Sequence, residues 1–224
     1  MKIACFIAYG YLENKVNVDS IIKNLVNHNL DNVEVHVYVG WNDKGNIFSF
    51  KKPNFKLGNI VEEYTYNLPP DSLHKVKSIK VKKEPHKGSQ KAYYSWHNLI
   101  SNVDIKYDKY LFFKDTFNET IDLHSILSVD YTLLIYDYYF IDSKGPQKNI
   151  WQGIKNKSNG YFNTNDMLIC SDTKLMSFSH SGFTKIKAAD FFNKGIKKKQ
   201  FSIIKLFMPD SKVYSLTHND YINI

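Results

Sequence analysis

Four polar clusters follow predicted strands of this 224-residue chain. They are Asn42-Asp43, Asp115 to Glu119, Asp137 with Asp142, and His218 to Asp220. If those strands are parallel, their carboxyl ends share one edge of a sheet and the clusters meet there. Carboxylates can then fix a hard cation, the cation can neutralise a diphosphate, and loop amides can hold a base and ribose. A single acid at a strand end usually caps a loop, so the order and number of the clusters predict the diphosphate site.

The spacing of apolar residues predicts the elements that would position these clusters. An apolar run over 3–8 predicts a strand that ends in Tyr9-Gly10-Tyr11. Helical spacing follows from Val18 to Val26, with Asn17 or Asp19 as the expected N-cap. A strand over 33–39 completes a strand–helix–strand start, which is typical of a parallel sheet. Further strands are expected at 79–81, 110–113, 131–141, 167–170, 202–207 and 213–216, and further helices at 89–100 and 188–193.

Composition limits the class of protein and its partners. The formal net charge is +8, and because the chain contains no arginine every fixed positive charge is a lysine. The absence of guanidinium groups argues against a dedicated nucleic-acid reader. Lysine clusters could meet a phosphate or an acidic membrane surface, although such clusters are more often solvated faces: Lys51-Lys52, Lys80 with Lys82-Lys83, and Lys197 to Lys199.

Cysteine and hydropathy patterns indicate the compartment. Cys5 and Cys170 both lie inside apolar runs, where a thiol behaves as a small buried hydrophobe, so we expect no disulfide framework. No apolar stretch reaches the length of about 20 residues that crosses a bilayer, and we see no leader sequence. We therefore expect a cytoplasmic protein with no transmembrane segment.

Taken in order along the chain, several segments resemble the family 2 glycosyltransferases, which have a GT-A fold and use a nucleotide-sugar donor. Each match is loose, and their order carries the resemblance. KIACFIAYGY is similar to the first strand and nucleotide loop, VEVHVYVGWNDKG to the second strand with an acidic base-binding loop, and HKGSQKAYYSWHNLI to the helix before the metal strand. YDKYLFFKDTFNE is similar to the strand that carries the DxD signature, VDYTLLIYDYYFIDSKG to a strand of the acceptor half, HSGF to the glycine turn, AADFFNKGIKKK to the acidic helix, and LTHNDY to a late metal-binding histidine.

The resemblance implies one GT-A domain over 1–224, with a Rossmann-like nucleotide-binding half at 1–115 and an acceptor half at 116–224. It implies a mixed, mainly parallel sheet flanked by helices. The implied activity is inverting transfer of a sugar from a nucleotide-diphosphate sugar to a hydroxyl of a glycan or glycoconjugate. The implied donor contacts are Tyr9, Asp43, Lys91, Lys114 and Asp115.

The resemblance also implies a general base and a metal. Asp190 takes the position of the base, although the same carboxylate could equally complement a helix dipole. Asp115 and His218 are the implied ligands of Mn²⁺ or Mg²⁺.

The DxD signature itself departs from the family pattern, since one acid remains. If Asp115 is the ribose-side member, Phe117 occupies the metal side and Glu119 must substitute. If Asp115 is the metal-side member, Phe113 displaces the ribose contact, and in either register Lys114 could supply positive charge. Metal dependence therefore stays open. The alternatives to an enzyme are a GT-A-like domain that binds nucleotide or glycan without turnover and, more remotely, a basic nucleic-acid-binding protein.

Overall fold

The computed structural model describes the N-terminal part of the chain in most detail. It covers residues 1–10, 12–41, 63–81, 90–103 and 105–130, and beyond them the short segments 133–135, 139–142, 145–147, 161–163, 168–171, 174–179, 182–187, 213–216 and 219–221. Most of the segments after residue 130 are described as backbone alone. The fold and the candidate site are therefore built on the first 130 residues.

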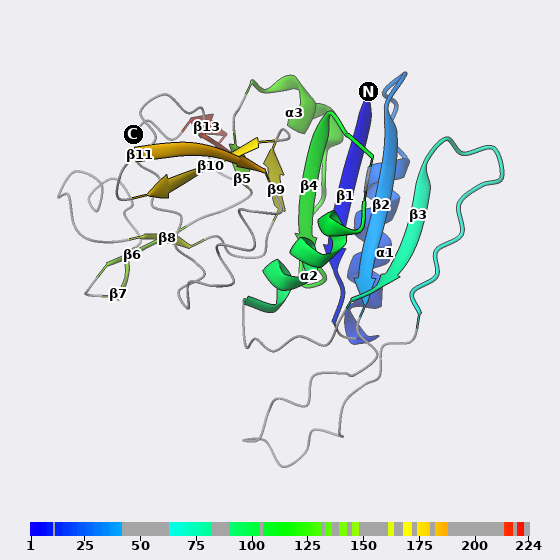
Figure 1. Ribbon diagram of the computed structural model, residues 1–224. Helices are drawn as coiled ribbons and strands as arrows, with labels where there is room; N and C mark the ends of the chain where they lie inside the picture. Colours follow the sequence, from blue (N-terminus) through cyan, green and yellow to red (C-terminus); the bar gives the residue numbers. More distant parts are fainter. Residues whose placement is uncertain are drawn as a thin grey trace, which may run out of the picture.

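Four parallel strands form the body of the structure (Figure 1). They are β1 (Lys2–Ala8), β2 (Glu34–Trp41), β3 (Lys75–Lys80) and β4 (Lys109–Lys114). β1 lies between β2 and β4, and β3 pairs with the outer side of β2. All four strands end at the same edge, so the residues that follow β1 and β4 meet there.

The described strands after residue 130 extend this sheet and add two small ones. β9 (Leu168–Ser171) lies antiparallel between β4 and β5 (Leu133–Ile135), followed by β12 (Val213–Ser215) and β13 (Asp220–Tyr221). The resulting order is β13-β12-β5-β9-β4-β1-β2-β3. The small sheets pair β10 (Lys174–Ser179) with β11 (Gly182–Lys187), and β6 (Tyr139–Asp142) with β7 (Gly145–Gln147) and β8 (Tyr161–Asn163).

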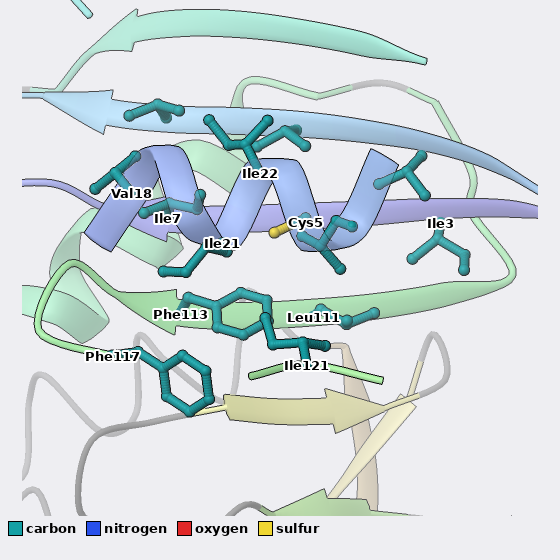
Figure 2. Close-up of a cluster of buried hydrophobic side chains, with 14 of the residues drawn as sticks. Ile3, Cys5, Ile7, Val18, Ile21, Ile22, Leu111, Phe113, Phe117 and Ile121 are labelled. Atoms are coloured by element: carbon teal, nitrogen blue, oxygen red, sulfur yellow. The ribbon is translucent and has the colours of Figure 1, made fainter. Parts of the chain in front are cut away.

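Helix α1 (Lys15–Val26) covers one face of the parallel strands and follows the single-turn helix η1 (Leu12–Asn14). Alternate residues of a strand point to the same face, so Ile3, Cys5 and Ile7 of β1 meet the apolar stripe of α1. Figure 2 shows this cluster, in which Leu111 and Phe113 of β4 lie on the same side. The short helix α3 (Leu123–Ser128) adds to it, with Asp122 as an N-cap that accepts a hydrogen bond from the His124 amide.

Helix α2 (Gln90–Ser101) lies on the opposite face, in front of the strands in Figure 1. The indole of Trp96 contacts Phe112 of β4, with 5.8 Å between the ring centroids, and its Nε1 donates to the Phe113 carbonyl at 3.0 Å. Gly40 of β2 lets the helix approach closely, because a Cβ there would lie 2.8 Å from Ser95 Oγ. The core is thus two layers of side chains, one on each face of the parallel strands.

The α/β class and the parallel arrangement of the first strands confirm the prediction from sequence. Two detailed predictions, the N-cap of α1 and the strand over 131–141, were wrong. Asn17 and Asp19 do not cap α1, because the helix already begins at Lys15 after η1 and both residues lie inside it. The expected single strand over 131–141 is two strands, β5 and β6, which pair in different sheets.

Other predictions are confirmed in outline or lie outside the described residues. β3 begins four residues earlier than the predicted strand at 79–81, and α3 was not expected. The helix expected at 188–193 and the strand at 202–207 fall outside the described residues, and the division into halves 1–115 and 116–224 stays a prediction. Within the described part of the chain, no helix combines the length and the apolar character that crossing a membrane requires.

Candidate functional site

The loops that follow β1 and β4 are joined at the carboxyl edge of the sheet by Asp115. Its carboxylate Oδ2 accepts a hydrogen bond from the Gly10 amide at 2.9 Å, and its own amide donates to the Ala8 carbonyl at 3.1 Å. The β2 end is tied in as well, because the Tyr9 amide donates to the Gly40 carbonyl at 2.9 Å. The sequence places these groups about a hundred residues apart, and the parallel order of β2, β1 and β4 brings them together.

The first turns of α1 reach the same edge. Asn17 Nδ2 donates to the Asp115 carbonyl at 3.1 Å, which links the helix to the loop after β4. Lys15 Nζ lies 2.6 Å from Asp19 Oδ2, and the hydroxyl of Tyr64 donates to the other oxygen of Asp19. Lys15 also lies over the Tyr64 ring, 5.4 Å from its centroid. A compact polar group of Asp19, Lys15 and Tyr64 therefore lies beside Asp115.

Tyr9 is a core residue at this edge. Its side chain is only 4% exposed, and its ring meets Tyr64 edge to face, with 5.4 Å between the centroids. Burial raises the pKa of the Tyr9 phenol, and the nearby Asp115 and Asp19 raise it further. Burial and then the hydrogen bond to Asp19 likewise raise the pKa of Tyr64. Both phenols therefore stay neutral, and the Tyr9 ring packs inside the site.

The residues around the incomplete DxD signature have separate environments. Asp115 is 6% exposed, whereas Phe117 is 1% exposed and packs against Phe113, with 5.3 Å between the ring centroids. Phe117 thus belongs to the hydrophobic core on the α1 side. Glu119 is exposed, and Lys114 is half-buried at the end of β4. Of the two possible registers, the one that places Phe117 at the metal side would need Glu119 to reach in from the surface.

The remaining predicted site residues are not placed beside this group. Asp43, Asp190 and His218 lie outside the described residues, and Lys91 lies in the first turn of α2 with only its backbone described. Among the described residues, no group of three or more His, Cys, Asp or Glu side chains could hold a metal ion. The described carboxylates near Asp115 include Asp19, which is already bonded to Lys15 and Tyr64. Mg²⁺ is commonly held by one or two carboxylates together with substrate phosphates.

Sequence reasoning missed three contributors to the site: Asn17, Asp19 and Tyr64. Asn17 and Asp19 were noticed only as helix caps, although both lie near the start of the helix that follows the β1 loop. Tyr64 lies in a stretch with no clear periodicity, so nothing local indicated it. It contacts Tyr9 and Asp19 because the segment that begins at residue 63 lies beside the carboxyl edge of the sheet.

A hollow adjoins this polar group. A cavity of about 600 Å³ lies between α1 and the segment 65–67, and its lining includes both Lys15 and Asp19. Its volume is in the range of small-molecule sites. The carboxyl edge thus combines a concave surface, a buried carboxylate fixed by a backbone amide, and two lysines, Lys15 and Lys114, on its two sides.

Comparison with protein-family models and with curated proteins finds no match for this chain.

Proposed function

We propose that the protein is a glycosyltransferase of the GT-A kind, which transfers a sugar from a nucleotide-diphosphate sugar to a hydroxyl of a glycan or glycoconjugate. The observation that carries this proposal is the hydrogen bond from the Gly10 amide to Asp115 Oδ2 at 2.9 Å. It joins the predicted nucleotide loop to the acid of the predicted signature at the carboxyl edge of parallel strands, where such folds bind nucleotides. The resemblance noted in the sequence requires these two segments to meet.

The charges at the edge suit a diphosphate. Lys114 stands at the end of β4 on the α2 side, and Lys15 stands at the start of α1 beside Asp19. Asp115 is held in one orientation by Gly10, and in the proposed complex its carboxylate meets a ribose hydroxyl or a cation carried by the donor. In this role Lys114 stabilises the negative charge that grows on the departing diphosphate, and the nucleoside occupies the hollow along α1.

The transfer step is a direct displacement with inversion. An oxygen of the acceptor hydroxyl forms a bond to the anomeric carbon while the bond from that carbon to the diphosphate oxygen breaks. The electron pair of the broken bond leaves with the diphosphate, and the hydroxyl proton passes to the carboxylate of Asp190. The proposed partners are the donor and a glycan acceptor, and the proposed location is the cytoplasm.

One observation favours a second candidate, a domain that binds nucleotide or glycan without turnover. Phe117 is buried in the core at a position where the signature would place a second carboxylate. Asp115 is also engaged by a backbone amide, so among the described residues the signature supplies a single carboxylate to hold a cation at the leaving group. Such a domain would bind the same donor and leave it intact.

Thermal unfolding with a panel of nucleotide sugars, with and without Mn²⁺ or Mg²⁺, tests the proposal. We expect one nucleotide class to raise the melting temperature, because binding to the folded state alone stabilises it. Asp115→Asn keeps an oxygen for the Gly10 amide but removes the charge, and it should weaken donor binding by about tenfold. Asp31→Asn, on the exposed loop before β2, is the matched control and should bind as the parent does.

Turnover separates the two candidates. Slow hydrolysis of the bound donor, lost in Asp190→Asn while the melting shift is kept, supports the transferase. Binding with no hydrolysis and no transfer to any glycan supports the binding domain. If no nucleotide sugar shifts the melting temperature, or if Asp31→Asn loses the shift as Asp115→Asn does, the carboxyl edge is not a donor site.

A further inference from the structure

A second cavity lies on the α2 face of the sheet, away from the carboxyl edge. Its volume is about 370 Å³, and it is bounded by β2, β3 and the segment that leads from α2 to β4. Its lining includes His36, Tyr38, Lys75, Lys77 and Asn102. Val37, Val103 and Ile105 complete the lining, so the cavity joins an apolar wall to the charged and hydroxyl groups of these residues.

Two lysines of edge strand β3 give this cavity its charge. Lys75 pairs with His36 in the register of β2 and β3, and Lys77 pairs with Tyr38, so all four residues share one face. Lys75 and Lys77 are two residues apart on a strand, which places their Cα atoms about 7 Å from one another. Two ammonium groups at this spacing match a small dianion such as a phosphate group.

Carbonyl groups at the C-terminal end of helix α2 could repel an anion in this cavity, but several of them accept hydrogen bonds. The carbonyls of Leu99 and Ile100 accept from the amides of Asn102 and Val103 at 3.1 and 3.2 Å. The carbonyl of Asn98 accepts from Asn102 Nδ2 at 2.7 Å. These bonds satisfy carbonyls that would otherwise carry the negative end of the helix dipole toward an anion.

A chain of buried hydrogen bonds ends at the cavity. His36, only 2% exposed, bonds through Nε2 to Glu34 at 2.5 Å and through Nδ1 to the Tyr107 hydroxyl at 2.8 Å. The Tyr107 hydroxyl bonds in turn to the hydroxyl of Tyr38. The bond to His36 lowers the pKa of Glu34, while burial and the bond to Tyr38 raise the pKa of Tyr107. Glu34 therefore stays ionised and Tyr107 stays protonated.

The protons of this chain can be arranged in two ways. With neutral His36, Nε2–H donates to Glu34, Nδ1 accepts from Tyr107, and Tyr107 accepts from Tyr38. If a ligand takes the Tyr38 proton as an acceptor, Tyr107 must donate to Tyr38, and Nδ1 then needs a proton of its own to donate to Tyr107. The second arrangement has one proton more, carried by an imidazolium between Glu34 and Tyr107.

We propose that this cavity binds a small phosphate-bearing ligand through Lys75, Lys77 and the Tyr38 hydroxyl, and that binding takes up a proton at His36. The site is independent of the proposed donor site, which uses the carboxyl ends of the strands and residues of α1. The titratable groups around the chain of hydrogen bonds come from β1, β2, β3, β4 and the segments before β3 and β4: Lys2, Glu34, Tyr38, His74, Lys75, Lys77, Tyr107, Asp108 and Tyr110.

Calorimetric titration of the full chain with sulfate and with inorganic phosphate tests the charge requirement. Sulfate is the better probe for proton uptake, because it stays a dianion throughout the neutral range. The double variant Lys75→Gln/Lys77→Gln should weaken binding of both anions by roughly tenfold. Lys80→Gln is the matched control, since Lys80 lies on the other face of β3 over the Trp41 ring and its loss removes a charge from the same strand.

Titration in buffers of different ionisation enthalpy tests the proton. We expect sulfate binding to take up a proton and therefore to tighten as the pH falls. Tyr38→Phe should abolish the uptake and weaken binding severalfold, and circular dichroism and the melting temperature confirm that each variant is folded. Amide NMR shifts at 75–79 and 102–105, rather than at 9–17, place the ligand.

Three results would overturn the proposal. They are the absence of saturable binding of either anion, binding that is equal in the double lysine variant and in Lys80→Gln, and shifts confined to the carboxyl edge. Proton uptake that is the same in Tyr38→Phe and the parent would overturn the assignment to His36. The donor-binding assay uses other ligands and other variants, so the two proposals fail separately.

Discussion

The two faces of the parallel strands are built from the same short stretches of sequence but differ in chemistry. In β2, Val35, Val37 and Val39 enter the hydrophobic cluster on the α1 side, whereas Glu34, His36 and Tyr38 face the α2 side. Parallel strands covered by helices are commonly apolar on both faces. In this protein the α2 face buries a chain of hydrogen-bonded side chains. Burying these polar groups is tolerated because each of the bonded atoms has a partner. The α1 face supplies cohesion, and the α2 face can respond to protons and ligands.

Truncating neighbouring phenylalanines of β4 compares the faces directly and should give the largest effect. Phe113 faces α1 and Phe112 faces α2, and both are fully buried. Phe113→Ala should lower the free energy of unfolding by about 3–5 kcal/mol. Phe112→Ala should cost about as much, because Phe6 and Trp96 pack against its ring and the cavity left between them is apolar and stays dry. Urea unfolding of the two variants measures both losses, and a much smaller loss for Phe112→Ala would show that the α2 face admits water where the α1 face does not.

Adding one methyl group to β2 tests how tightly α2 lies on its face, and the expected effect is intermediate. The Cβ of Gly40→Ala would meet Leu99 Cδ1 at 3.0 Å as well as Ser95 Oγ at 2.8 Å, so we expect a loss of about 1–3 kcal/mol. Ser95 Oγ is buried with no hydrogen-bond partner. Ser95→Ala should therefore be close to neutral by itself.

The double variant sharpens this second comparison. Gly40→Ala/Ser95→Ala should recover part of the loss, because it removes the nearer of the two obstructing atoms. Chemical denaturation of the single and double variants gives the coupling free energy between the two sites. Additive losses would mean that Leu99 alone sets the spacing between helix and sheet.

Local patterns predicted the elements of both faces but not the contacts between them. The spacing of Val18, Ile21, Ile22 and Leu25 predicted α1, and all of these residues are buried. The apolar run 131–141 predicted one strand, yet β5 and β6 separate there because each is bounded by its own partner strands. Strand ends are set by pairing across the sheet, which no local pattern contains.

For the candidate site, too, the sequence predicted the segments that take part but not the contacts between them. The acid at the end of β4 and the loop after β1 were identified from their positions after apolar runs. The bond from Asn17 to the Asp115 carbonyl spans 98 residues, and the Tyr64 contact with Asp19 spans 45, so neither follows from sequence spacing. Burial of the Tyr9 ring had the same cause, because Tyr64 covers it from a segment whose fold had no local signal.

A pair of histidines at the amino end of the strands gives the smallest expected effect and extends the comparison to pH. His28 follows α1 and His74 precedes β3, with 5.2 Å between their ring centroids. His28 Nδ1 accepts from the Leu30 amide and His74 Nδ1 from the Val35 amide, so the neutral ring is the form that the fold binds. Burial lowers the pKa of both imidazoles, and repulsion from His74 lowers that of His28 further.

These lowered pKa values fix the sign of the pH dependence. In the unfolded state the imidazoles have their ordinary pKa of about 6.5, so this state binds more protons than the folded state. The free energy of unfolding therefore falls as the pH drops below about 6.5, and it levels off once both imidazoles are also charged in the folded state. His28→Gln should flatten this dependence, because it removes one titrating ring and its repulsion of the other. His124→Gln, at the exposed start of α3, is the control and should leave the slope unchanged. Urea unfolding between about pH 5 and 8 measures the slope, and an undiminished slope in His28→Gln would contradict the assignment of the acid sensitivity to this pair.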